Sequence, residues 1–238
     1  MADISQIRYD AAAKAKLQES FVGQEKRGVI VLADISGYTE LLTTTQAEKS
    51  ARIVAHITER VFGATTEPFI VNEIEGDALF TYTVEPPTGE ALVRLTFEQL
   101  ETYADAFYHA MEELTYSTLK DDPDLAALIK RVSMKFVIHY GSFQVNKIGP
   151  FVKLVGADII LPHRLLKNSV DSDSYFLFSK AFLDLDEDRD HNKAMALVEE
   201  IKHFGSVDVG ARTFDYDAEH EARHGREHDH LTRRGVTI

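Results

Sequence analysis

The pattern of hydrophobic and polar positions predicts a buried strand, an amphipathic helix and a β-hairpin in the first part of the chain. Residues 28–34 form an almost uninterrupted apolar run rich in β-branched side chains, which predicts a strand covered on both faces. Residues 46–62 place apolar side chains three and four positions apart, the period of an amphipathic helix. Residues 69–71 and 78–83 are again apolar, and they flank a polar turn centred on Gly76, which is typical of a β-hairpin.

The same pattern continues toward the C-terminus and predicts further helices and strands. Helices are expected at 3–21, at about 92–118, at 156–166 and near 190–202; strands are expected at 132–140 (with 143–155 extending it into a ribbon), near 175–178, near 204–208 and near 212–216. No internal repeat and no second core are visible. We expect an N-terminal helical extension (1–27), a main domain (28–185) with a C-terminal part (186–216), and a polar tail (217–238).

Charge and composition narrow the classes of function. Of the 238 residues, 26 are Lys or Arg and 39 are Asp or Glu, which gives a net charge of −13. An acidic chain lacks the basic face that binds a nucleic-acid backbone, and without cysteine it has no thiolate metal site. No signal-peptide profile and no apolar run long enough to cross a bilayer is visible. We therefore expect a cytoplasmic protein whose partner is a small molecule or another protein.

Two aspartates stand at positions suited to metal binding. Asp34 ends the first apolar strand, and Asp77 follows Gly76 at the tip of the hairpin. Hard divalent cations prefer such oxygen ligands and keep coordination positions open for phosphate oxygens. The alternative is that Asp34 caps the following helix and that Asp77 is an ordinary turn residue.

Four segments, in order along the chain, resemble the motifs of class III nucleotidyl cyclases. Residues 31–39 (VLADISGYT) resemble the F-x-D-I-x-G-F-T motif and residues 73–80 (EIEGDALF) the K-x-x-G-D hairpin; residues 135–143 (KFVIHYGSF) resemble the R-I-G-I-H-x-G strand and residues 155–165 (VGADIILPHRL) the W-G-x-x-V-N-x-A-x-R helix. Together the motifs span about two thirds of the chain.

The resemblance implies an α+β fold with a ferredoxin-like βαββαβ core, added helices and a C-terminal extension. It also implies a homodimer that binds a nucleoside triphosphate between its subunits with Mg²⁺ or Mn²⁺. Asp34 and Asp77 match the family's metal-binding aspartates, and the backbone carbonyl of Ile35 matches a third metal ligand. Arg164 matches the arginine that stabilises the pentavalent phosphate during attack by the ribose 3′-hydroxyl.

Three positions depart from the family's pattern. The asparagine that contacts the ribose is Ile160 here, which can neither donate nor accept a hydrogen bond. The lysine that reads adenine corresponds to Glu73, and its aspartate partner corresponds to Lys153, so both charges are reversed. We expect Glu73 and Lys153 to face each other across the dimer interface. They would either read a different base or form an ion pair that closes the pocket; alternatively, the bound nucleotide is not cyclised.

Other candidate residues have simpler interpretations. His139 lies in a predicted strand, where a hydrogen-bonded core histidine is favoured over a catalytic one. Asn168 stands one helical turn after Arg164 and is a weak substitute for the missing asparagine. Four histidines of the polar tail fall within a short segment, but a solvated tail is favoured over a zinc site there: His220, His224, His228 and His230.

Two functions therefore remain from the sequence. The first is a divergent nucleotidyl cyclase, a phosphorus-oxygen lyase, that binds a metal–nucleoside triphosphate with non-standard base specificity or weak cyclisation. The alternative is a catalytically inactive module of the same fold that binds a nucleotide or only dimerises. The sequence does not identify the base.

Overall fold

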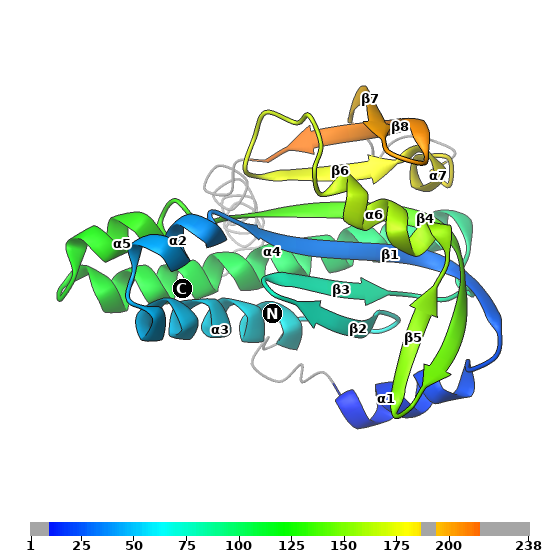
Figure 1. The fold of residues 1–238 in the computed structure, drawn as a ribbon, viewed down its shortest axis with the longest axis horizontal. Coiled ribbons are helices and arrows are strands. Elements are labelled where there is room, and N and C mark those ends of the chain that lie inside the picture. Colours follow the sequence, from blue (N-terminus) through cyan, green and yellow to red (C-terminus); the bar gives the residue numbers. More distant parts are fainter. Residues whose placement is uncertain (1–9, 187–193, 215–238) are drawn as a thin grey trace, which may run out of the picture.

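The computed structural model describes residues 10–186 and 194–214 and contains one mixed eight-stranded sheet with helices on both faces (Figure 1). The helices are α1 (Ala11–Ser20), α2 (Tyr38–Thr44), α3 (Ala47–Gly63), α4 (Gly89–Leu119), α5 (Pro123–Ile129), α6 (Ala157–Leu165) and α7 (Lys180–Leu183). The strands are β1 (Glu25–Ser36), β2 (Ile70–Glu75), β3 (Ala78–Tyr82), β4 (Ser133–Ile148), β5 (Phe151–Val155), β6 (Tyr175–Ser179), β7 (Met195–Ile201) and β8 (Gly205–Thr213). Among the described residues, no helix is both long enough and apolar enough to span a membrane.

The strand order confirms the expected ferredoxin-like core. Neighbouring strands follow the order β2-β3-β1-β4-β6-β8-β7, and β5 pairs with the far part of β4. Within this sheet, β1, β2, β3 and β4 are antiparallel neighbours, and α3 and α4 make the long connections between them. This is the βαββαβ pattern, which is complete at β4. Strand β6 pairs with β4 in parallel and extends the sheet. The antiparallel strands β8 and β7 extend the sheet beyond β6.

The two faces of the sheet are covered very differently. The long helices α3 and α4 pack on one face and contribute residues such as Ile57 and Tyr103, which are fully buried. The other face is covered by the shorter helix α6, through Ile159 and Leu165 (Figure 1). Because successive side chains of a strand point to opposite faces, the central strands β1 and β4 supply apolar side chains to both clusters. This explains the near-continuous apolar run of residues 28–34.

The C-terminal part differs from the sequence-based expectation. The prediction of a helix near 190–202 is wrong for the residues that the structure describes, because residues 195–201 form strand β7. Residues 187–193 lie outside the described part. The two strands expected near 204–208 and 212–216 are a single strand, β8, through Thr213. Residues 195–200 include strong helix formers, yet pairing with β8 across a tight turn imposes the extended form. Tertiary pairing therefore overrides local propensity here.

Two further expectations fall partly or wholly outside the described residues. The N-terminal helix was expected from residue 3 to residue 21, and the structure describes it as α1 from Ala11 to Ser20. Residues 3–9 and the polar tail with its four histidines lie outside the described residues.

Two opposed glycines allow the central strands to meet their neighbours closely. Gly28 in β1 and Gly141 in β4 are Cα partners in the β1–β4 ladder. A Cβ at Gly28 would lie 1.9 Å from the carbonyl oxygen of Thr83, and one at Gly141 would lie 2.3 Å from Oδ2 of Asp158. These positions therefore require glycine because of space rather than because of backbone conformation.

We expect Gly28→Ala to lower the free energy of unfolding by about 1–3 kcal/mol, the usual cost of overpacking, because the contacted atom is backbone and cannot turn aside. Urea titration followed by circular dichroism measures the change. The matched control is Gly63→Ala in α3, where an added Cβ meets no atom within 4 Å and helix propensity improves. Equal stability of the two variants would contradict the close approach at Gly28.

Candidate active site

Strand pairing brings the two predicted metal-binding aspartates to the same end of the sheet. Asp34, near the end of β1, has Ala78 of β3 as its Cα partner on one side. Asp77 directly precedes Ala78 in the β2–β3 turn, where Gly76 adopts a positive φ of 66°. The hairpin therefore presents Asp77 beside Asp34.

A lysine that the sequence analysis did not single out completes this cluster. Lys135 of β4 is the Cα partner of Asp34 on its other side, and its Nζ lies 2.9 Å from Oδ2 of Asp34. The Asp34 and Lys135 side chains are only 16% and 22% exposed, respectively. Beyond Lys135, Tyr175 of β6 is the next residue in the same row across the sheet. Asp34, Lys135 and Tyr175 thus lie side by side on three neighbouring strands. On the other side of Asp34 the row continues with Ala78 of β3, which Asp77 directly precedes.

The electrostatics of the cluster show that Asp34 acts on the carboxyl group of Asp77. Burial raises the pKa of Asp77 above its ordinary value, and the negative charge of Asp34 raises it further; a backbone hydrogen bond and Lys135 oppose the rise. Burial by itself lowers the pKa of Lys135, but the hydrogen bond and the charge of Asp34 outweigh it, so the pKa of Lys135 is raised. Lys135 therefore carries a positive charge at neutral pH and neutralises only part of the aspartate pair.

The donor set of this cluster fits a hard divalent cation. Two carboxylates and the backbone carbonyl of Ile35, which follows Asp34 in β1, offer oxygen ligands of the type that Mg²⁺ and Mn²⁺ prefer. In the described part of the chain, no group of three or more His, Cys, Asp or Glu side chains is arranged to hold a metal. An ion held here would take its remaining ligands from water or phosphate oxygens.

Helix α6 carries the residue that matches the transition-state arginine. Arg164 is exposed and forms no ion pair with any of the described residues. Ile160 lies one turn earlier on the same face of α6 and is 50% exposed. Among the described residues, no ion pair joins Arg164 to Asp34 or Asp77.

Glu73 and Lys153 form an ion pair within one chain. Oε2 of Glu73 accepts a hydrogen bond from the Lys153 ammonium, and its Oε1 accepts one from Nδ2 of Asn72 at 2.9 Å. The side chains of Glu73 and Lys153 are 31% and 40% exposed. The expectation that they face each other across a dimer interface is therefore wrong, because β2 and β5 of the same subunit bring them together.

The ion pair lines a small cavity that the N-terminal helix partly covers. Its volume is about 390 Å³, and its walls come from α1, β2 and the β4–β5 ribbon. Helix α1 is anchored there because Gln18 donates to the carbonyl oxygen of Val71 at 3.2 Å and Lys147 binds Glu19 at 2.8 Å. The two residues that the sequence comparison predicts to read the base thus form an internal ion pair beside α1.

The remaining candidate residues have structural roles. Nδ1 of His139 bonds the Ser179 hydroxyl at 2.8 Å, and burial lowers the pKa of His139 although the nearby Asp158 opposes this. His139 is therefore a neutral core histidine at pH 7. Asn168 donates to the hydroxyl of Tyr175 at 2.7 Å and to the carbonyl of Leu165, so its amide group is already engaged within the subunit.

The sequence contains a signal for the two residues that were missed. Lys135 is the one Lys, Arg, Asp or Glu in the mainly apolar stretch 132–140, and a charge within such a strand requires a partner. Only the register of β4 against β1 and β6 shows that its neighbours are Asp34 and Tyr175. The sequence pattern predicts the strand but not this register.

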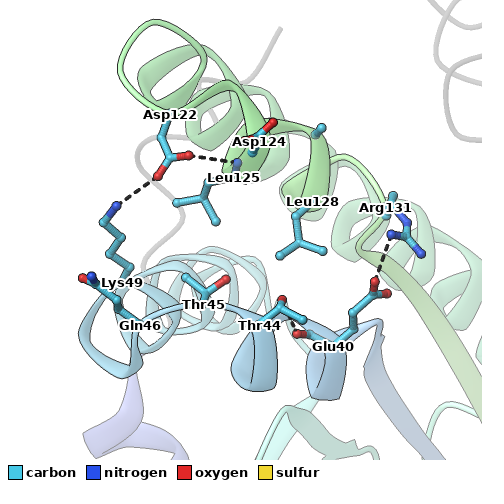
Figure 2. A pocket seen from close by; sticks show the side chains of 11 residues that line it. Glu40, Thr44, Thr45, Gln46, Lys49, Asp122, Asp124, Leu125, Leu128 and Arg131 are labelled. Carbon is cyan, nitrogen blue, oxygen red and sulfur yellow. Dashed lines mark hydrogen bonds and ion pairs between the residues drawn. The ribbon is translucent and has the colours of Figure 1, made fainter.

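A second hollow lies between α2, α3 and α5 (Figure 2). Its volume is about 530 Å³, and none of the cyclase-motif residues lines it. Two ion pairs cross it: Nζ of Lys49 lies 3.0 Å from Oδ2 of Asp122, and Nη1 of Arg131 lies 2.9 Å from Oε1 of Glu40 (Figure 2). These pairs connect α5 to α2 and α3, so a structural role accounts for this hollow.

A comparison with known sequences finds one curated relative. It is the "Uncharacterized protein Rv2561/Rv2562" of Mycobacterium tuberculosis, which is 33% identical over 110 residues. The match covers 45% of this chain and 48% of that protein, so the chain spans about half the length of the curated relative.

Similar solved structures support the fold described above. The adenylyl cyclase CyaB from P. aeruginosa is 14% identical with a TM-score of 0.63, over 81% of this chain and 96% of that one. The guanylyl cyclase Cya2 is 17% identical with a TM-score of 0.65, over 80% and 93%. A class III adenylyl cyclase-like ATP-binding protein from Pseudomonas aeruginosa is 14% identical with a TM-score of 0.55, over 68% and 35%. At these identities the likeness shows that the chain has a class III cyclase-like fold.

The family comparison covers the region that holds most of the site. The matched segment, residues 54–175, includes Asp77, Lys135 and Arg164, whereas Asp34 precedes it. Because this segment is just over half of the 238 residues, the chain belongs to the family described as "Protein of unknown function (DUF2652)".

Proposed function

We propose that this protein binds a metal–nucleoside triphosphate between two copies of the chain and has weak or non-standard nucleotidyl cyclase activity. The observation that carries the proposal is the arrangement of Asp34 and Asp77 at one end of the sheet, close enough for Asp34 to raise the pKa of Asp77. Two partly buried, mutually repelling carboxylates are costly unless a cation compensates them. A divalent ion bound to a triphosphate would provide that compensation.

The proposed chemistry is an internal displacement at the α-phosphorus. The ribose 3′-oxygen forms a bond to the α-phosphorus and loses its proton, while the bond to the leaving pyrophosphate breaks. A divalent ion at the site would lower the cost of forming the attacking oxyanion and bind the phosphate oxygens. Asp34, Asp77 and the carbonyl of Ile35 would hold that ion. Arg164 would stabilise the charge of the pentavalent phosphorus.

An isologous dimer would complete the site. In one subunit Arg164 is exposed and has no ion-pair partner among the described residues, which suits a group that acts on a neighbouring subunit. Ile160, one turn before Arg164 on α6, is an apolar side chain that is half exposed. Burial of such side chains favours association of two copies.

The departures at the ribose and base positions favour unusual specificity and low turnover. Ile160 cannot hold the ribose, and losing one group that acts in the transition state typically lowers turnover by about 10²–10³. Glu73 and Lys153 are partly exposed, so their ion pair contributes at most about 1 kcal/mol. A base with complementary donors and acceptors could therefore replace this contact without a large loss of stability.

The second candidate is an inactive binding or dimerisation module of the same fold. The ion pair between Glu73 and Lys153 favours it, because an internal pair fills the position of base recognition. A neighbour of the same fold is itself described as an ATP-binding protein. The decisive experiment is to incubate purified protein with each of the four ribonucleoside triphosphates and Mg²⁺ or Mn²⁺, and to measure both binding and cyclic product. Binding without product would support the module, and no binding would refute the proposed function.

We expect Asp77→Asn to weaken Mn²⁺–nucleotide binding by more than the 10–100-fold typical of losing a second-shell partner, since it removes a direct ligand. The same change should stabilise the metal-free protein at pH 7. Because the pKa of Asp77 is raised in the folded state, ionised Asp77 opposes folding above that pKa, and the gain should vanish as the pH falls toward 3.8. Isothermal titration calorimetry and thermal denaturation measure these effects. Exposed Asp171→Asn is the control, and unchanged metal binding would refute the role of Asp77.

Complementation between variants tests the shared site. We expect Asp34→Ala and Arg164→Ala each to abolish turnover, and an equal mixture to recover up to about one quarter of the wild-type turnover, because half of the randomly mixed dimers contain one intact site. Cyclic product is measured before and after mixing, and light scattering gives the oligomeric state. If the protein stays monomeric at high concentration, Arg164 cannot act on a neighbouring subunit, and the shared site is refuted.

The Glu73→Ala variant separates the two roles of the ion pair. We expect it to change the order of affinity for the four triphosphates, because unpaired polar groups discriminate strongly between ligands. Its melting temperature should hardly change, because the pair is partly exposed. Glu59→Ala, an exposed residue of α3, is the control. An unchanged preference together with a weaker dimer would assign the pair a structural role instead.

A further inference from the structure

The Lys135 ammonium lies where a cation bound to Asp34 would lie. It contacts Oδ2 of Asp34 at 2.9 Å from the neighbouring strand, and β1–β4 register fixes this approach. Its charge also acts on Asp77 and on Tyr175. Lys135 is therefore the one side-chain cation whose charge acts on all three of these residues in the described part of the chain.

A metal ion that bridges Asp34 and Asp77 would meet this ammonium at short range. Both would share the same carboxylate, and the low exposure of the side chains weakens screening by water. With Lys135 in place, two negative charges and one positive charge leave a net charge of −1 at the cluster. The aspartate pair would attract a divalent ion more strongly if the Lys135 side chain moved away from Asp34.

The side chain of Lys135 is able to withdraw. A lysine ammonium is a point charge on a flexible four-carbon stem, unlike the rigid fork of an arginine. The hydroxyl of neighbouring Tyr175 is held by Asn168 at 2.7 Å, so this neighbour stays in place when Lys135 moves. Movement of one side chain thus suffices, without a change of the sheet.

We propose that Lys135 is a built-in competitor of the metal ion: it occupies Asp34 in the metal-free protein and is displaced when the ion enters. The proposal rests on the proposed function, in which the two aspartates hold a divalent cation. Free metal binds weakly because it must displace the ammonium. The triphosphate supplies negative charge to the displaced ammonium, so metal and triphosphate increase each other's affinity.

The test uses Mn²⁺ alone, without nucleotide, on the wild-type protein, on Lys135→Met and on the exposed-lysine control Lys130→Met. Electron paramagnetic resonance measures free and bound Mn²⁺. We expect Lys135→Met to bind Mn²⁺ about ten-fold or more tightly than the wild type, and Lys130→Met to match the wild type. Equal or weaker binding by Lys135→Met would overturn the proposal, because Lys135 would then serve to position Asp34 for the metal.

A second measurement on the wild-type sequence avoids dependence on the folding of a variant. Lysines are labelled by reductive ¹³C-methylation, and the Lys135 signal is assigned with Lys135→Arg. Addition of Mg²⁺ should shift this signal and leave that of Lys130 unchanged, whereas an unshifted Lys135 signal would refute displacement. Neither measurement contains a nucleotide, so failure of nucleotide binding leaves the result on Lys135 intact, and the two proposals can fail separately.

Discussion

The antiparallel pairing of β1 with β4 is the constraint on which the rest of the structure depends. The ladder runs without interruption from Glu25 to Ser36 along β1, and both strands contribute side chains to the two apolar clusters. A shift of one residue would exchange the faces of every side chain in these strands. The register is therefore fixed by the core, and the same register places Lys135 beside Asp34. Packing of the interior thus sets the geometry of the candidate site.

The unequal cover of the sheet indicates where the second subunit of the proposed dimer would fit. On one face, α3 and α4 bury residues such as Ile57 and Tyr103 completely. On the other face, the shorter helix α6 leaves Ile160 and Arg164 exposed near the aspartate end of the sheet. A second chain bound on this face would shield the site from water and would bring its own arginine at position 164 to the two aspartates. The fold consequently favours a function that depends on assembly.

The site combines retained and altered parts of the cyclase pattern. In the proposed site, Asp34, Asp77 and Arg164 match the family's groups that bind and stabilise phosphates. Ile160 and the pair of Glu73 with Lys153 stand at the positions of those that hold the ribose and base. Phosphate recognition is shared by all nucleoside triphosphates, while base recognition depends on the pattern of donors and acceptors. Under the proposed function, the alteration would therefore change selectivity and positioning more than the capacity to hold a metal–triphosphate.

The sequence by itself determined the core elements, and it supplied the candidate site residues as predictions. The apolar run at 28–34, the helical period at 46–62 and the turn at Gly76 predicted β1, α3 and the β2–β3 hairpin, because these patterns reflect local periodicity. Only the tertiary structure decided which residues meet. The pairing of Asp34 with Lys135, the contact of Glu73 with Lys153 and the strand form of residues 195–201 all depend on partners distant in sequence. Strand register and long-range pairing are set by the packing of the whole sheet, and no local pattern encodes them.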